Sequence, residues 1–186
     1  TGDDNDQITA YNTYSSDFEM GGGNDFANLR AVTGDFWSGS GHDLITVDNR
    51  NLKKTKDKEF RVNLGEGTDQ IFARGEAINV NGDKGNDSCY YEGTSCNSET
   101  SLIFNGGLDD DLLSVGSASS GNIIFRGGGG DNDSLALHFA DSRHIDLTNE
   151  LMPSNHKSKK AQNISNDERW MLKHGDLKIE LQQVEW

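Results

Sequence analysis

The stretch Gly128-Gly129-Gly130-Asp131-Asn132-Asp133-Ser134-Leu135 decides how this chain is expected to fold. Its glycines allow backbone conformations closed to other residues, so the loop can turn tightly and aim its carbonyl groups inward. Asp133 adds a negatively charged oxygen ligand, and Leu135 begins a strand that points into a core. A loop of this kind suits a hard cation, above all calcium, which takes oxygen ligands in a flexible geometry.

The same pattern recurs seven times along the chain. An aspartate has glycine or aspartate two residues before it and an apolar or small residue two residues after it. The aspartates are Asp6, Asp25, Asp43, Asp69, Asp87, Asp111 and Asp133. The positions two before them hold Asp4, Gly23, Gly41, Gly67, Gly85, Asp109 and Asp131. The positions four before them hold Gly2, Gly21, Gly39, Gly65, Asp83, Gly107 and Gly129. The positions two after them hold Ile8, Ala27, Ile45, Ile71, Cys89, Leu113 and Leu135.

The spacing of these aspartates predicts a solenoid. Successive aspartates are 19, 18, 26, 18, 24 and 22 residues apart, which is a period near 18 to 20 with loop insertions. Between the motifs apolar residues alternate, as in Phe60, Val62 and Leu64, which is the period of a strand with one side facing a core. Each coil is therefore predicted as strand, turn, strand and motif loop, with the lysine-rich segment 49–58 as a surface insertion.

These residues resemble the nonapeptide repeats of the RTX family, G-G-x-G-x-D-x-U-x, in which U is a large apolar residue. The segment 106–113 fits with one Gly-to-Asp change, and the resemblance covers roughly residues 1 to 140. It implies an all-β, right-handed parallel β-roll or β-helix of about seven coils. In regular RTX blocks the motif recurs every nine residues and both edges bind calcium. Here it recurs about every eighteen, so one edge and one row of about six ions are expected.

The expected calcium ligands are aspartate carboxylates and loop carbonyls. They comprise the seven aspartates of the pattern together with Gly21, Gly23, Gly39, Gly41, Gly65, Gly67, Gly85, Gly107, Asp109, Gly129 and Asp131. The first copy is weak because no coil precedes it, and the fifth because Asp83 replaces a glycine. The alternative is that Asp and Gly only form turns, which their local hydrogen bonding favours. Turns alone do not require an aspartate column kept in register, so calcium is preferred.

Composition supports a cation-dependent fold and excludes some partners. Only 32% of residues are hydrophobic, with 22 glycines and one proline, which indicates many turns and short strands. No apolar run approaches the roughly 20 residues of a membrane span. The formal net charge of −14 disfavours nucleic acid as a partner and makes the compact state repel itself. About six calcium ions would add about +12, and without them a disordered chain is expected.

Two domains are expected, with residues 1–147 as the calcium-binding solenoid and residues 148–186 as a C-terminal cap. Asn149 to Asp167 is polar and is predicted as loop. Alternating apolar residues on either side of residues 174–176 predict a β-hairpin that covers the open last coil. Trp170 and Trp186 are interpreted as core of this cap rather than as a binding platform.

The cysteines and histidines do not indicate catalysis. Cys89 and Cys96 could form a disulfide or remain free thiols, and both options stay open. The five histidines form no H-E-x-x-H motif and have no nucleophile motif beside them, so the chain is not expected to be an enzyme.

The RTX resemblance implies a repeat domain of a secreted bacterial toxin or exoprotein. Such a domain would leave the cell unfolded by type I secretion and fold when it meets extracellular calcium. The missing initial methionine and signal-like segment favour an excised region of something longer. Besides calcium, its partners would be a host-cell surface or other domains of the parent protein. The alternatives are an adhesin or a receptor- or carbohydrate-binding segment, and a β-helical polysaccharide lyase or epimerase. The last would need an acid/base constellation that the sequence does not display.

Overall fold

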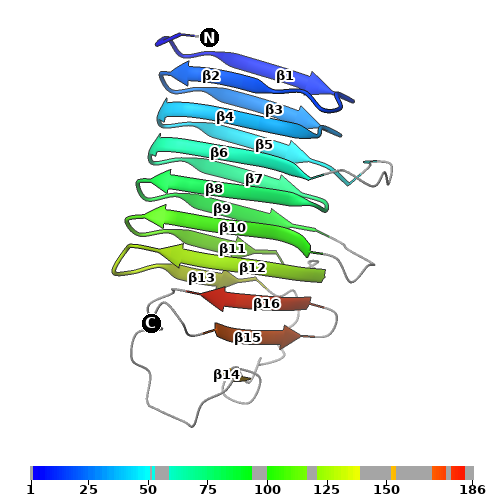
Figure 1. Ribbon diagram of the computed structural model, residues 1–186, viewed down its shortest axis with the longest axis vertical. Helices are drawn as coiled ribbons and strands as arrows, with labels where there is room; N and C mark the ends of the chain where they lie inside the picture. The colour runs from blue at the N-terminus through cyan, green and yellow to red at the C-terminus, as the bar shows by residue number, and fades with distance from the viewer. Residues whose placement is uncertain are drawn as a thin grey trace.

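The chain winds into a parallel β-solenoid built from two sheets (Figure 1). The computed structural model describes residues 2–50, 52, 59–93, 100–116, 121–138, 152–153, 169–174 and 177–182. All regular elements among these residues are β-strands, so the all-β solenoid class predicted from the motif spacing is confirmed. Residues 51 and 53–58 of the lysine-rich insertion, together with Cys96 and Trp186, lie outside the described residues.

Strands with odd numbers, up to β13, form one sheet and those with even numbers form most of the other. The seven-stranded sheet consists, in spatial order, of β1 (Gln7–Tyr11), β3 (Phe26–Arg30), β5 (Leu44–Asp48), β7 (Gln70–Arg74), β9 (Ser88–Glu92), β11 (Leu112–Val115) and β13 (Ser134–Leu137). The nine-stranded sheet consists of β14 (Met152–Pro153), β15 (Arg169–His174), β16 (Leu177–Gln182), β12 (Gly121–Gly128), β10 (Thr100–Leu108), β8 (Ile78–Lys84), β6 (Phe60–Gly67), β4 (Gly34–Gly41) and β2 (Phe18–Gly22).

Each turn of the solenoid is an odd strand, a loop, an even strand and a motif loop. The strands of successive turns pair in parallel, as in β3 with β5 and β4 with β6. The number of complete turns is slightly smaller than the seven expected. Within the described chain, the position beside β12 is taken by β16 of the C-terminal hairpin rather than by a strand that follows β13 directly.

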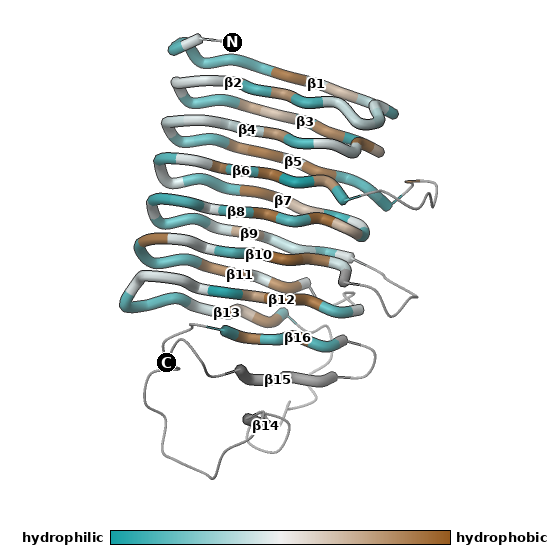
Figure 2. Tube along the Cα trace, in the orientation of Figure 1, coloured by the Kyte–Doolittle hydropathy of each residue, from teal (hydrophilic) through white to brown (hydrophobic). Residues whose placement is uncertain are grey.

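The core lies between the two sheets and follows from the alternation of apolar residues. The apolar positions two residues after the motif aspartates face inward, and those of the middle turns are fully buried: Ala27, Ile45, Ile71, Cys89 and Leu113. On the other sheet, Phe104 and Phe125 stack with ring centroids 5.5 Å apart. Figure 2 shows hydrophobic segments recurring at similar places along successive strands. Cys89 is a buried free thiol, which excludes the disulfide to Cys96 in this structure.

A C-terminal hairpin extends the larger sheet. Strands β15 and β16 pair antiparallel, as predicted, and β16 pairs in parallel with β12. Met152 and Pro153 form the short strand β14 against β15, so the prediction of loop is wrong for these two residues. The exposed edge of β15 offers the backbone groups with which they pair. Among the described residues, no helix is long and apolar enough to cross a membrane.

Glycines are required where successive turns of the solenoid bend into the motif loops. Gly39 has φ of 114°, and a Cβ atom there would overlap the carbonyl oxygen of Gly21 in the preceding turn. Asp83 occupies the same column with φ of 79°, paired between Gly65 and Gly107. Aspartate tolerates this left-handed conformation better than most residues, so the column continues without glycine at that point.

We expect Gly39→Ala to lower the free energy of unfolding by at least about 2 kcal/mol, because strain at positive φ adds to a clash with backbone. Gly116→Ala is the matched control, since its φ is not in the left-handed region and the nearest atom to a Cβ would be at an ordinary 3.5 Å. Its effect should stay within about 0.5 kcal/mol. Urea denaturation followed by circular dichroism measures both, and equal effects would contradict the close stacking of the glycine column.

Candidate metal-binding edge

All the motif loops lie at one edge of the solenoid. Each connects the end of an even strand to the start of the next odd strand, as between Gly41 and Leu44 or between Gly67 and Gln70. In Figure 1 these short turns stand one above another on the left side. The connections at the other edge differ in length, for example between Arg30 and Gly34 and between Val115 and Gly121. The structure thus brings the predicted motif copies into one row.

The motif aspartates are buried at this edge and hydrogen-bond to one another through the backbone. Six of the seven are at most 3% exposed, and Asp6 of the first turn is half-buried. Each aspartate N–H donates to the Oδ1 atom of the aspartate one turn later. The donor and acceptor residues are Asp6 and Asp25 (2.7 Å), Asp25 and Asp43 (2.8 Å), Asp43 and Asp69 (2.7 Å), Asp69 and Asp87 (2.8 Å), Asp87 and Asp111 (2.9 Å), and Asp111 and Asp133 (2.9 Å). We call this row of hydrogen bonds the aspartate ladder.

The second carboxylate oxygen is buried without a hydrogen bond from any described residue. This holds for the Oδ2 atoms of Asp25, Asp43, Asp69, Asp87 and Asp111. The carboxylates reach across the inside of the turn toward the even strands: a Cβ atom placed on Gly82 would lie 2.5 Å from Oδ2 of Asp87. Gly106 has the same relation to Asp111, where a Cβ atom would overlap Oδ2. Buried oxygens of charged groups normally have hydrogen-bond or metal partners. We therefore expect each of these oxygens either to bind a ligand or to carry a proton.

Burial makes the ladder carboxylates hard to ionise. It raises the pKa of Asp69 to about 6, of Asp87 to about 7 and of Asp111 to about 8. The N–H donated to each carboxylate lowers the pKa in part, and the charges of the adjacent aspartates raise it again. The pKa of Asp43 is raised as well, first of all by burial. Without a bound cation, the carboxyl groups of Asp87 and Asp111 are therefore partly protonated near neutral pH.

A second row of hydrogen bonds, which the motif alignment did not reveal, runs beside the ladder. In five of the copies, the residue just before the motif aspartate accepts a hydrogen bond from the following turn. Asn5 Oδ1 accepts from the N–H of Asn24 (2.7 Å), Asn24 Oδ1 from His42 (2.8 Å), and His42 Nδ1 from Thr68 (3.0 Å). Further along, Asn86 Oδ1 accepts from Asp110 (3.1 Å). His42 is therefore an exposed residue whose ring nitrogen accepts a hydrogen bond that joins two successive turns.

The structure places the predicted glycine positions over one another, with one correction. Gly21, Gly39, Gly65 and Gly107 stand in one column and all have positive φ. Gly23, Gly41, Gly67 and Gly85 stand in the next, and Asp109 takes the same position with φ of 74°. In the last loop, however, Gly128 pairs with Gly107 and Gly130 stacks on Asp109. The predicted positions Gly129 and Asp131 are wrong for these columns, because this loop is one residue longer.

The ladder presents carboxylate oxygens of successive turns one after another rather than as a single cluster of metal ligands. Among the described residues, no three His, Cys, Asp or Glu side chains come together as a group that could hold a metal ion. An ion at this edge would take carboxylate oxygens from successive turns and backbone carbonyls for its remaining ligands. The unpartnered Oδ2 atoms of the ladder are the atoms with which it would fit.

Comparisons of the chain with protein-family models, with curated protein sequences and with solved structures found no match.

The metal-free protein should become less stable as pH rises from about 5 to about 8. Ladder carboxylates with raised pKa bind more protons in the folded state than in the unfolded chain, whose aspartates titrate near 3.8. The unfolding free energy therefore falls across this window. Carboxylates with lowered pKa, such as Asp48 hydrogen-bonded to Arg50, titrate below it.

Protein freed of metal with a chelating resin tests this expectation, with circular dichroism to follow its fold from pH 5 to pH 8 and urea to unfold it at each pH at which it is folded. Asp87→Asn should flatten the slope near pH 7, since one titrating group of the ladder is removed. A profile that rises between pH 5 and pH 8 would contradict the burial of ionisable carboxylates at this edge.

Proposed function

We propose that this chain is a calcium-binding repeat domain of a secreted bacterial protein, similar to RTX regions, that folds when calcium neutralises its aspartate ladder. The observation that carries the proposal is the row of buried carboxylates from Asp25 to Asp111, each with one oxygen in the ladder and the other without a hydrogen-bond partner among the described residues. Calcium takes six to eight oxygen ligands at about 2.3–2.6 Å and accepts irregular arrangements of carboxylates and carbonyls. The site residues are those of the motif columns, with Gly128 and Gly130 in the last loop.

The residue types at this edge support a requirement for negative charge. In the second row, where the acceptors lie nearer the solvent, the chain uses Asn5, Asn24 and Asn86 as well as other polar residues. Asparagine would accept the same hydrogen bond in the buried ladder without the free-energy penalty of a desolvated charge. Yet all seven ladder positions are aspartate. A bound divalent cation gives this choice a physical reason, because it needs the anionic oxygen.

The charge of the whole chain supports the same proposal. Ionised carboxylates on adjacent turns repel one another in a region screened from water, and the formal net charge is −14. One ion between each pair of successive motif loops would add about +12. Binding free energy would then become folding free energy, because the unfolded chain has no preformed site. The domain would act as a calcium-triggered folding module rather than as a catalyst.

Calcium titration tests the proposal directly. At pH 7.5 in chelator we expect a far-ultraviolet spectrum of a disordered chain, and above a calcium threshold the spectrum of β-structure with a thermal midpoint that rises with calcium. Magnesium at the same concentration should be much less effective, since it prefers octahedral coordination and holds its waters. A chain that is equally folded and equally stable in chelator and in calcium would overturn the proposal.

The variant Asp111→Asn separates the hydrogen bond from the charge. The amide oxygen can still accept from the N–H of Asp87, so the ladder is kept while one anionic ligand is removed. In chelator we expect the variant to keep its β-structure to a higher pH than the parent, because a buried charge is gone. Its gain in stability from calcium should be smaller than that of the parent.

Asp17→Asn is the matched control, because Asp17 is exposed and lies at the opposite edge, between β1 and β2. It removes the same formal charge without touching the ladder, so its calcium response should equal that of the parent. Asp6→Asn, in the half-buried first turn, should fall between the two. If Asp111→Asn retains the full calcium gain, the ladder is not the calcium site.

A further inference from the structure

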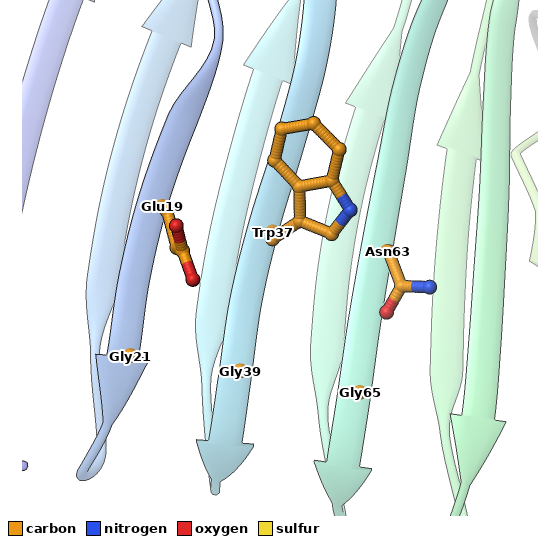
Figure 3. A pocket seen from close by; sticks show the side chains of 6 residues that line it. All are labelled: Glu19, Gly21, Trp37, Gly39, Asn63 and Gly65. Atoms are coloured by element: carbon orange, nitrogen blue, oxygen red, sulfur yellow. The ribbon is translucent and has the colours of Figure 1, made fainter.

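An exposed tryptophan interrupts a polar column on the outer face of the larger sheet. Trp37 of β4 is 41% exposed and pairs in register with Glu19 of β2 and Asn63 of β6. The column continues through Asn81, Asn105 and Arg126. Figure 3 shows the indole ring lying between the side chains of Glu19 and Asn63. All other members of this column are polar, so the aromatic ring is not required by the packing of the sheet.

The ring borders a shallow open hollow of about 370 Å³. It is lined by Glu19, Trp37, Asn63 and the three glycines that follow them on the same strands, Gly21, Gly39 and Gly65. The glycines are required because a side chain at these positions would collide with the backbone of the preceding turn. As they have no side chains, the floor of the hollow consists of backbone. On the other side of the tryptophan the surface is closed by an ion pair, with Arg61 Nη1 3.3 Å from Asp35 Oδ1.

Two side-chain amides near the ring are available to a ligand. The side-chain amides of Asn63 and Asn81 make no hydrogen bond to any residue in the described part of the chain. Farther along the column the amides are engaged, since Arg126 donates to Asn105 Oδ1 (2.7 Å) and to Gln182 Oε1 (2.9 Å). The unengaged amides of the column are therefore those of Asn63 and Asn81, and together with Glu19 and Trp37 they form one continuous segment. We call it the tryptophan column.

Trp37 differs from Phe72, an exposed aromatic residue on the opposite sheet. There Phe72 and Tyr90 stack on each other with ring centroids 4.8 Å apart, so each covers part of the other. Such cross-strand pairs stabilise a sheet by themselves. Among the described residues no ring stacks on Trp37 in this way. Exposing a large aromatic face to water without a stacking partner suggests that something outside the chain covers it.

We propose that the tryptophan column binds a linear, uncharged oligosaccharide laid along the solenoid axis. The flat indole face suits the C–H face of a pyranose ring, and amides both donate to and accept from neutral hydroxyl groups. Neighbouring strands are about 4.8 Å apart, close to the length of one sugar unit in an extended chain, so successive units meet successive rows. A polyanionic chain is disfavoured by Glu19 and by the net charge of −14. A protein partner would call for a cluster of apolar anchors rather than one ring among amides.

The binding test uses the whole chain in calcium, folded as judged by circular dichroism, and four neutral hexasaccharides: cellohexaose, chitohexaose, xylohexaose and laminarihexaose. Isothermal titration calorimetry should detect binding of at least one, and the corresponding disaccharide should bind at least about tenfold more weakly, because it covers fewer rows. Absence of binding to all four up to millimolar concentration would overturn the proposal. A chain that folds without calcium leaves this test unchanged, so it can fail separately from the calcium proposal.

Variants and spectra locate the site. Trp37→Ala should weaken binding by about tenfold or more, as expected for the loss of a central aromatic contact, and Trp37→Tyr should retain part of it. Phe72→Ala is the matched control on the opposite sheet and should leave the affinity unchanged. In the unaltered protein, the indole N–H resonance missing from Trp37→Tyr should be the tryptophan signal that the sugar shifts most. Equal affinity of Trp37→Ala, or shifts confined to the other two tryptophans, would overturn the assignment.

Discussion

The hydrogen bond from one aspartate N–H to the carboxylate of the next aspartate is the interaction on which the solenoid edge depends. Residues in the motif loops have left the sheet, and their buried N–H groups need acceptors from elsewhere. The carboxylate of the following turn supplies one at 2.7–2.9 Å throughout the row. Replacing it by an apolar residue would leave the donor unpaired. The residue that sets the register of each turn also brings a buried charge, so stacking and charge neutralisation cannot be separated at this edge.

The architecture could be predicted from the sequence because the motif positions at one edge of the solenoid accept few residue types. The inside of each tight turn admits glycine or a residue that accepts positive φ, and the ladder position is always aspartate, so alignment on Asp25, Asp43 and Asp69 found the period. The alternation after each motif then indicated which residues enter the core. The sequence pattern misplaces the last loop by one residue, because its run of four glycines, Gly127 to Gly130, satisfies the pattern in more than one register. Only pairing with Gly107 decides between them.

The features that the sequence did not reveal depend on chemistry that several residue types can perform. The second row of hydrogen bonds uses asparagine, histidine and other polar side chains, so no single letter marks it, although position −1 relative to each motif aspartate is polar in every copy. Trp37 was missed for another reason. Phe36 and Trp37 are adjacent, and the sequence alone does not say which of them faces out. The register with β2 and β6 places Phe36 in the core at 1% exposed and Trp37 on the surface.

The two proposed sites are physically linked because they share strands. Strands β2, β4, β6 and β8 each carry an outward residue of the tryptophan column and run directly into a motif loop: Trp37 precedes Asp43 by six residues, and Asn63 precedes Asp69 by six. The rows of the column exist only while neighbouring turns are stacked, and stacking is fixed by the ladder. A cation that stabilises the ladder would therefore also assemble the column, and a ligand on the column would favour the stacked state in which the cation binds. The coupling requires no conformational change within the folded state, because the same folded turns carry both sites.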